Sequence, residues 1–216
     1  MRWLRRRRSG QGVSPGDPRE LAERFWSGWR ELLPEVAAAL GDREPNRVEN
    51  QLCELVAAVH PRLHFTIDRG QRAVYALVVS GQEDPELRPY TDAWKAAAPA
   101  DDGLWEYHDS VPAVPDPTKV TVNLGVHRIA LADVRVVAQV DDAAGVVDVA
   151  VHHPAMAELE PAARAAMTFL PLDATLGERL AGERLRRVET AVAEPSGTIG
   201  LLELRDLVRE LASLHP

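Results

Sequence analysis

The side chains best suited to acid–base chemistry lie in one short aromatic segment. Glu106, His108 and Asp109 follow Trp105 closely, and residues 104–108 alternate between apolar and polar types. This alternation indicates a strand, which places Glu106 and His108 on the same face. A carboxylate beside an imidazole can hold and transfer a proton. These residues are therefore candidate catalytic groups.

His64 is the fourth catalytic candidate. It lies in residues 63–67, which also alternate like a strand with one buried face. If this strand neighboured the Glu106 strand, His64 could join an acid–base cluster at the edge of a sheet. Ligands bind beyond the carboxyl ends of parallel strands, so such a site would open onto residues 80–84 and 108–110. The alternative is ordinary strand termination.

Other catalytic and metal-binding patterns are weaker. His108-Asp109-Ser110 contains the residue types of a hydrolase triad, but adjacent residues rarely converge on one point, and no G-x-S-x-G sequence occurs. His152 and His153 are candidate metal ligands, although consecutive strand residues point to opposite faces. Glycine-rich nucleotide-binding sequences and H-E-x-x-H are absent. We expect no metal and no cofactor.

The segment 72–109 must position these side chains. Ala73–Val79 is a near-continuous apolar run, which is typical of a strand covered on both faces. Asp84 and Pro85 are favourable residues for starting a helix, and Pro99 ends it. With the aromatic strand that follows, the segment predicts a βαβ unit with parallel strands. Residues 63–67 add an antiparallel hairpin partner.

A helix with several aromatic residues precedes this unit. It begins near Asp17-Pro18, and Pro34 is expected to kink or split it. Phe25, Trp26 and Trp29 could form an interaction surface, since tryptophan is favoured at binding hot spots. The alternative is that they dock the helix on the sheet. A second helix begins near Pro45 and ends at His60-Pro61.

The second half of the chain reads as strands followed by helices. A proline-rich connection at 111–117 leads into short strands and a clear hairpin. Pro171 is expected to break a helix that starts near Ala157. The predicted elements are strands at 120–124, 127–131, 134–140, 147–151 and 184–192, and helices at 157–170, 174–180 and from Leu201.

Together these elements predict an α+β fold. We expect a mixed, largely antiparallel sheet with one βαβ unit and helices packed mainly on one face. Residues 1–16 read as a disordered basic tail and 17–216 as a single domain. That domain would have a helical part (17–61), a sheet-rich core (62–153) and a second helical part (154–216). No internal repeat is evident.

Charge is distributed unevenly. The 216 residues carry a formal charge of −8, but Arg2 and Arg5–Arg8 are all at the start, so residues 9–216 carry −13. An acidic body is a poor candidate for non-specific nucleic-acid binding, and we expect no specific nucleic acid as a partner. The arginine run is either a plain disordered tail or an arm that touches an acidic partner, anionic lipid or nucleic acid.

Composition also bears on the compartment. No apolar run is long enough to span a membrane, and no apolar stretch follows the basic start as in a signal peptide. A single cysteine, Cys53, excludes an internal disulfide and predicts a packed structural thiol. A cytoplasmic protein is expected.

Four short segments resemble a loosely defined group of uncharacterised bacterial proteins. They are 77–81, the PEL-x-P sequence within 84–89, Ala98-Pro99 and Leu104-Trp105. In that group a strand, a PEL-x-P helix start, an AP helix end and a tryptophan strand recur. The resemblance spans residues 50–155 and implies a cytoplasmic α/β domain. It implies no catalytic residue, cofactor or substrate.

The sequence leaves the oligomeric state, substrate and partner identity open. It favours a soluble protein-interaction or accessory module over an enzyme, because the body is acidic and no strong catalytic pattern occurs. An immunity-like protein that neutralises a basic partner would fit. The alternative is a small-molecule enzyme with a site at the carboxyl ends of strands 73–79 and 104–108.

Overall fold

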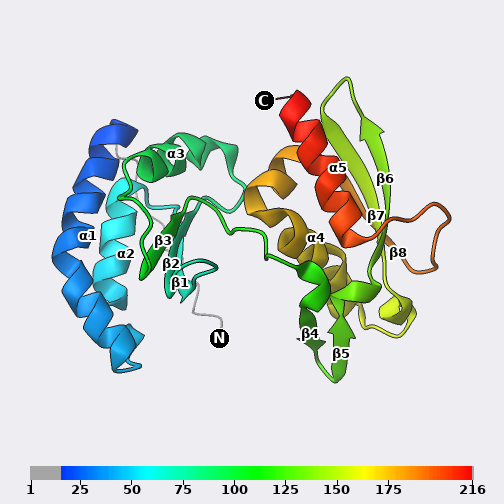
Figure 1. Ribbon diagram of the computed structural model, residues 1–216, viewed down its shortest axis with the longest axis horizontal. Coiled ribbons are helices and arrows are strands. Elements are labelled where there is room, and N and C mark those ends of the chain that lie inside the picture. Colours follow the sequence, from blue (N-terminus) through cyan, green and yellow to red (C-terminus); the bar gives the residue numbers. More distant parts are fainter. Residues whose placement is uncertain (1–15, 216) are drawn as a thin grey trace. The chain divides into compact units, whose positions relative to one another are not determined.

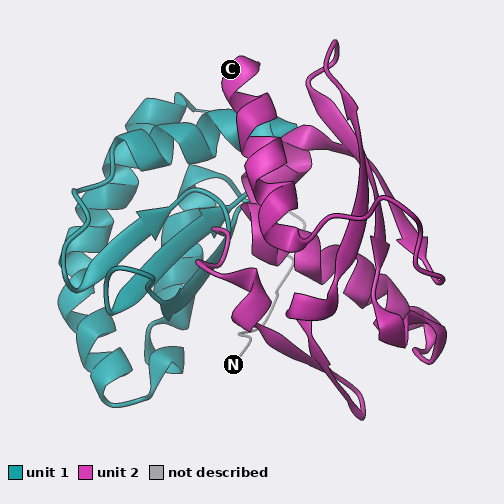
Figure 2. Cartoon of the chain, turned by 45° about the vertical axis from the view of Figure 1, so that its right-hand side comes forward, with its two compact units in different colours: residues 1–111 teal, residues 112–216 magenta. Residues whose placement is uncertain are grey.

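The computed structural model describes residues 16–215. They form two compact units, of which one ends at Val111 and the other begins at Pro112 (Figure 2). The described residues contain five α-helices and eight strands in mixed and antiparallel sheets, which confirms the α+β class. The predicted basic tail lies outside the described residues except for Gly16. A single domain over 17–216 stays a prediction, and its sheet-rich core at 62–153 crosses the boundary between the units.

The first unit is a three-stranded sheet covered by three helices (Figure 1). Strand β1 pairs antiparallel with β2, and β2 pairs parallel with β3, so the predicted hairpin and βαβ unit are confirmed. In chain order the elements are α1 (Pro18–Gly41), α2 (Glu49–Val59), β1 (His64–Arg69), β2 (Tyr75–Ser80), α3 (Arg88–Ala96) and β3 (Trp105–His108).

Helix α1 is one continuous helix. Asp17 caps its first turn by accepting from the N–H of Arg19 at 3.0 Å. The predicted split at Pro34 is wrong. A proline removes one backbone hydrogen bond, but Val36 and Ala39 beyond it are fully buried and hold the last turns in the core.

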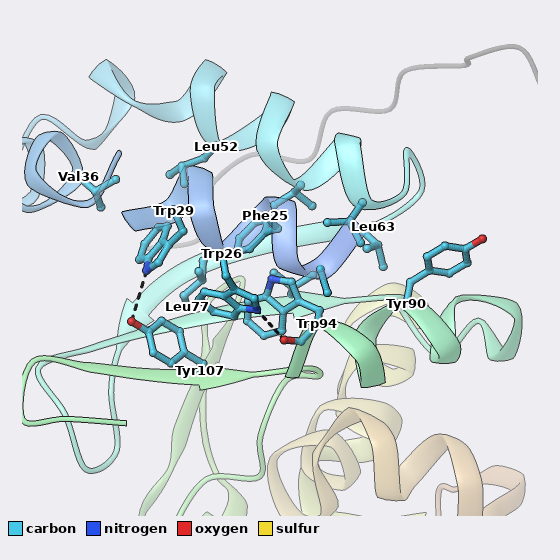
Figure 3. Close-up of a cluster of buried hydrophobic side chains, with 14 of the residues drawn as sticks. Phe25, Trp26, Trp29, Val36, Leu52, Leu63, Leu77, Tyr90, Trp94 and Tyr107 are labelled. Carbon is cyan, nitrogen blue, oxygen red and sulfur yellow. Dashed lines mark hydrogen bonds between the residues drawn. The ribbon is translucent and has the colours of Figure 1, made fainter. Parts of the chain in front are cut away.

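Aromatic side chains fill the core between the helices and the sheet (Figure 3). The ring centroids of Trp26 and Trp94 are 4.7 Å apart, and the Trp26 indole N–H donates to the carbonyl oxygen of Trp94 at 2.8 Å. Trp29 meets Trp105 edge-on at 5.0 Å. Other core residues include Phe25, Val36, Leu52, Val56, Leu77, Val79 and Tyr107.

This packing corrects one prediction. Phe25, Trp26 and Trp29 are all buried, so they do not form an exposed interaction surface. They instead dock α1 on the sheet, which was the alternative interpretation of the sequence. A buried aromatic side chain stabilises the fold more than an exposed one does. Three such residues on one stripe of the helix therefore favour packing against the core.

The second unit contains a separate hairpin and a second three-stranded sheet. Strand β6 pairs antiparallel with β7, and β7 pairs parallel with β8, while α4 and α5 share the core on one face of that sheet (Figure 1). In chain order the elements are β4 (Thr121–Leu124), β5 (His127–Ala130), β6 (Arg135–Asp141), β7 (Val146–His152), α4 (Pro161–Arg184), β8 (Leu185–Ala191) and α5 (Leu201–Leu214).

Both units contain a segment with the same order of elements, strand-strand-helix-strand. In each, an antiparallel hairpin is followed by a helix and then by a strand parallel to the second strand of the hairpin. The sequence predicted one βαβ unit, and the structure adds a second, β7-α4-β8. The repeat exists in the topology, and the sequence showed no matching period.

Helix α4 departs from the predicted break at Pro171. The helix continues through this proline, and the hydroxyl of Thr175 donates to the carbonyl of Pro171 at 2.6 Å. The kink lies instead at Gly177, where φ is +76° and ψ is 163°. The two helices predicted at 157–170 and 174–180 are therefore one element with a later kink.

Arg205 of α5 stabilises the region around this kink. Although buried, its guanidinium donates to the carbonyl of Thr175 at 2.7 Å. It also donates to the carbonyls of Pro115 and Val114 at 2.8 and 2.7 Å. Arg205 thereby joins the proline-rich segment to α4 and α5 with a planar set of donors that lysine could not reproduce.

Replacing Gly177 by alanine tests the kink. Its φ/ψ values lie in a region that is essentially restricted to glycine, so we expect a loss of about 1–3 kcal/mol in the free energy of unfolding. Urea denaturation measures this loss. Gly41→Ala is the control, because a Cβ there meets open space at a helix end, and it should be neutral or slightly stabilising. Equal stability of the two variants would contradict the account.

Candidate functional site

Glu106 lies in β3 on the face of the first sheet that faces away from the three helices. Its neighbours Trp105 and Tyr107 belong to the helix-side core, so alternation places Glu106 and His108 on the other face. In the register with β2, Ala76 is beside Glu106. The Glu106 side chain is 1% exposed. A carboxylate this deeply buried must have several hydrogen-bond donors.

The donors come from the turn between β1 and β2. Oε1 of Glu106 accepts from the backbone N–H of Gln71 at 2.7 Å. Oε2 accepts from the N–H groups of Arg72 at 2.9 Å and Ala73 at 3.2 Å. Nε2 of His108 lies 3.1 Å from Oε1. Both carboxylate oxygens are therefore occupied, and three consecutive backbone N–H groups depend on this one side chain.

These contacts decide the protonation of Glu106. Burial by itself would raise the pKa, but the N–H of Gln71, the ring of His108 and the N–H groups of Arg72 and Ala73 outweigh it and lower the pKa to about 2. The carboxylate is thus ionised at neutral pH, and Nε2 of His108 must be its donor. A carboxylate with so low a pKa is a weak proton acceptor.

The turn itself explains why the N–H groups converge. Gly70 is so tightly packed that a Cβ at this position would lie 2.5 Å from the carbonyl oxygen of Ala73. The N–H of Gly70 donates to the carbonyl of Val74 at 3.2 Å and closes the turn. Residues 71–73 then present their N–H groups together, as in the backbone concavities that bind anions. The anion is supplied by Glu106.

His64 is not part of this cluster. Strand β2 lies between β1 and β3, so the two strands that would have formed the predicted acid–base site are not neighbours. His64 pairs with Ser80, whereas His108 pairs with Val78. Two strand spacings and a two-residue offset separate the Cα atoms of the histidines by roughly 12 Å. The structure brings Glu106 and His108 together and leaves His64 apart.

The carboxyl end of β2 is organised by its own polar groups. The hydroxyl of Ser80 accepts from the N–H of Gln82 at 2.8 Å. Asp84 caps the following turn through the N–H of Glu86 at 3.0 Å. Arg62 joins Asp84 and Glu86 through two contacts of 2.7 Å. Of these residues, Ser80, Gln82 and Asp84 belong to the stretch 80–84 that the sequence predicted to border a ligand site.

At the carboxyl end of β3 no triad geometry forms. The hydroxyl of Ser110 donates to Asp109 at 3.4 Å, while the ring of His108 contacts Glu106 instead of Ser110. A triad needs the nucleophile, base and acid in a chain of hydrogen bonds. The three adjacent residues do not make that chain.

His152 and His153 are both buried in the second unit. Nδ1 of His152 lies 3.0 Å from the carbonyl oxygen of Ala191, and Nδ1 of His153 accepts from the N–H of Ala155 at 3.0 Å. Within residues 16–215, no three His, Cys, Asp or Glu side chains are placed to hold a metal ion. Cys53 is exposed on α2, so the predicted packed thiol is wrong.

Sequence reasoning missed the residues that close the outer edge of β3. Asp102 accepts from the N–H of Trp105 at 2.7 Å and donates its own N–H to the carbonyl of Trp105 at 2.9 Å. Asp101 accepts from the N–H of Tyr107 at 3.3 Å, and Lys95 donates to the carbonyl of Tyr107 at 2.6 Å. A pair of aspartates directly before an aromatic strand is the signal that could have indicated this role.

The chain was compared with known proteins. No protein-family model, curated protein or solved structure matches it. The resemblance to uncharacterised bacterial proteins therefore stays a prediction. In the part of the chain that the structure describes, no helix is both long and apolar enough to cross a membrane.

Replacing Glu106 by glutamine tests its structural role. The amide removes the charge and points an N–H₂ group at backbone donors, so the free energy of unfolding should fall by about 3 kcal/mol at neutral pH. That size follows from a pKa lowered from 4.5 to about 2, at about 1.4 kcal/mol for each pKa unit. Urea denaturation of both proteins measures the difference.

The contribution of Glu106 to the free energy of unfolding depends on pH. Because the pKa of Glu106 is lower in the folded state, its stabilisation is present above pH 4.5 and is lost as the pH falls toward 2. The gap between wild type and Glu106→Gln should therefore shrink over that interval. Glu54→Gln, at an exposed position on α2, is the control and should follow the wild type. A gap that is constant with pH would show that Glu106 is not the titrating group.

Proposed function

We propose that the protein is a cytoplasmic protein-interaction module, of the accessory or immunity-like kind, that binds a basic partner. The observation that carries this proposal is the state of Glu106, whose two oxygens accept three backbone N–H groups and the ring of His108. The chain's best-placed acid is a structural group, which favours a function exercised through surfaces.

The enzyme alternative is weakened by the same argument. A general base needs an accessible lone pair and a pKa near the working pH. Glu106 is buried and has a pKa of about 2. Ser80 and Asp84, at the carboxyl end of β2, each accept a backbone N–H of the adjoining turn. These contacts support binding over turnover.

Charge supports a basic partner. Residues 9–216 carry a formal charge of −13. Helix α1 buries its aromatic stripe and presents glutamates on its exposed side, among them Glu23 and Glu31. Facing potentials of opposite sign speed association and select partners. Three arginines, Arg19, Arg24 and Arg30, share this exposed side, so the test is made on the individual glutamates Glu23 and Glu31.

The experiment starts with affinity isolation from the source organism, using the full chain as bait. Each recovered protein is then purified and its binding measured directly by calorimetry at increasing salt. We expect one basic protein to bind, with affinity that falls as salt rises. Glu23→Lys/Glu31→Lys should weaken it. Asp142→Lys/Glu194→Lys is the matched control, with the same change in charge at exposed positions of the second unit.

Two outcomes would overturn this proposal. One is that no purified candidate binds at low salt, or that a partner binds equally well to both charge variants and at all salt concentrations. The other is turnover of a small molecule that His108→Ala abolishes while the fold, followed by circular dichroism, stays intact. That result would favour the site at the carboxyl ends of β2 and β3.

A further inference from the structure

Strand β8 forms an edge of the second sheet and presents an open backbone. Its inner side pairs with β7, and among residues 16–215 no other backbone segment pairs with its outer side. The opposite edge is partly covered, because Val136 of β6 exchanges two backbone hydrogen bonds of 2.9 and 2.8 Å with Ile199. An unpaired edge is a template for another strand.

The charges along β8 are self-complementary. Arg187 and Glu189 flank Val188, and both are exposed on the face of the sheet away from α4 and α5. Within one chain the guanidinium of Arg187 contacts the carboxylate of Glu189, so pairing with a second copy would add contacts across the strands to this existing pair. If a second β8 pairs antiparallel about Val188, each Arg187 lies opposite the Glu189 of the other copy. A pairing centred on Glu189 would place two glutamates opposite each other. The charges therefore favour the register centred on Val188 over the one centred on Glu189.

The irregularity at the start of β8 does not obstruct this pairing. Arg186 is an extra residue in the register with β7, but its guanidinium turns back onto the sheet. It contacts Asp148 at 2.7 Å and Asp141 at 2.8 Å. From Arg187 to Ala191 the strand pairs regularly with β7.

Helix α4 adds an apolar surface beside this edge. The hydroxyls of Thr168 and Thr190 are 2.7 Å apart, which places this part of α4 against β8. The adjacent Phe169 is 52% exposed. It continues a stripe with Ala162 and Ala165, which are also exposed, at the spacing of one helical face. A large exposed aromatic beside small residues can accept a second helix at close range.

We propose that two copies of this chain associate through the outer edges of β8. The strands pair antiparallel about Val188, the two three-stranded sheets become one of six strands, and the α4 faces carrying Phe169 pack together. The contact is isologous, so each copy contributes the same residues. The charge pattern indicates that the partner is a second copy of this chain. In an antiparallel copy of β8, Glu189 lies opposite Arg187 and Arg187 lies opposite Glu189. This association is independent of the proposed function.

The test is the mass of the full chain by analytical ultracentrifugation, over a dilution series from high to low micromolar. A mass near twice that of the chain is expected at the upper end. Glu189→Arg should raise the dissociation constant about tenfold, because like charges then face each other twice. Arg187→Glu/Glu189→Arg exchanges the two signs and should restore association.

A second pair of variants separates the apolar contact from general surface effects. Phe169→Glu should abolish the dimer. Val126→Glu makes the same kind of change at a residue that is 96% exposed at the tip of the β4–β5 hairpin, and it should leave the dimer unchanged. Both positions are exposed, so the fold is expected to persist, and circular dichroism checks it.

The proposal fails if the wild type stays monomeric throughout the series. It also fails if a dimer forms that is insensitive to Phe169→Glu, or if the charge exchange does not restore what Glu189→Arg weakens. Amide hydrogen exchange gives an independent reading, since amides between Arg187 and Thr190 should become more protected as the concentration rises. Protection that does not depend on concentration would overturn the strand pairing.

Discussion

The carboxylate of Glu106 is the contact on which the first sheet depends. It is contributed by the last strand of the unit, yet it satisfies three N–H groups in the turn between the first two strands. That turn is made tight by Gly70, and its N–H groups have no place in the strand ladder. One ionised side chain thus connects the hairpin to the crossover strand. Losing it would leave three backbone donors of this turn without their acceptor, which costs free energy for each donor.

The same requirement explains several other charged residues. Asp101 and Asp102 supply acceptors along the edge of β3, and Lys95 supplies a donor there. In the second unit, Arg205 provides three donors to carbonyls around the Gly177 kink and the proline-rich segment. Each is an ionisable group placed to complete the hydrogen bonding of the backbone. Glu106, which the sequence presented as a candidate catalytic group, and these four residues are all engaged by the main chain.

Local signals predicted the elements, and tertiary contacts decided the roles. The alternation of apolar and polar residues and the helix caps were sufficient to predict the β1–β2 hairpin and the parallel β3, because these features depend on residues close together in the sequence. The role of Glu106 was not predictable in this way, since its partners Gln71–Ala73 are more than thirty residues away. Pro171 was a strong local signal for a helix end, but the buried side of α4 outweighed it. The backbone was redirected at Gly177, where glycine permits the turn.

The length of the connection between the crossover helix and the last strand determines whether the chain covers the edge of that strand. In the first unit, residues 97–104 lie between α3 and β3, and this connection carries the aspartates that close the edge of β3. In the second unit, α4 ends at Arg184 and β8 begins at Leu185, so no loop remains to fold over the edge. The same order of elements therefore gives one edge that the chain closes itself and one that it leaves open. An open edge next to an exposed phenylalanine costs solubility unless something covers it, and the residues of β8 match a second copy of themselves.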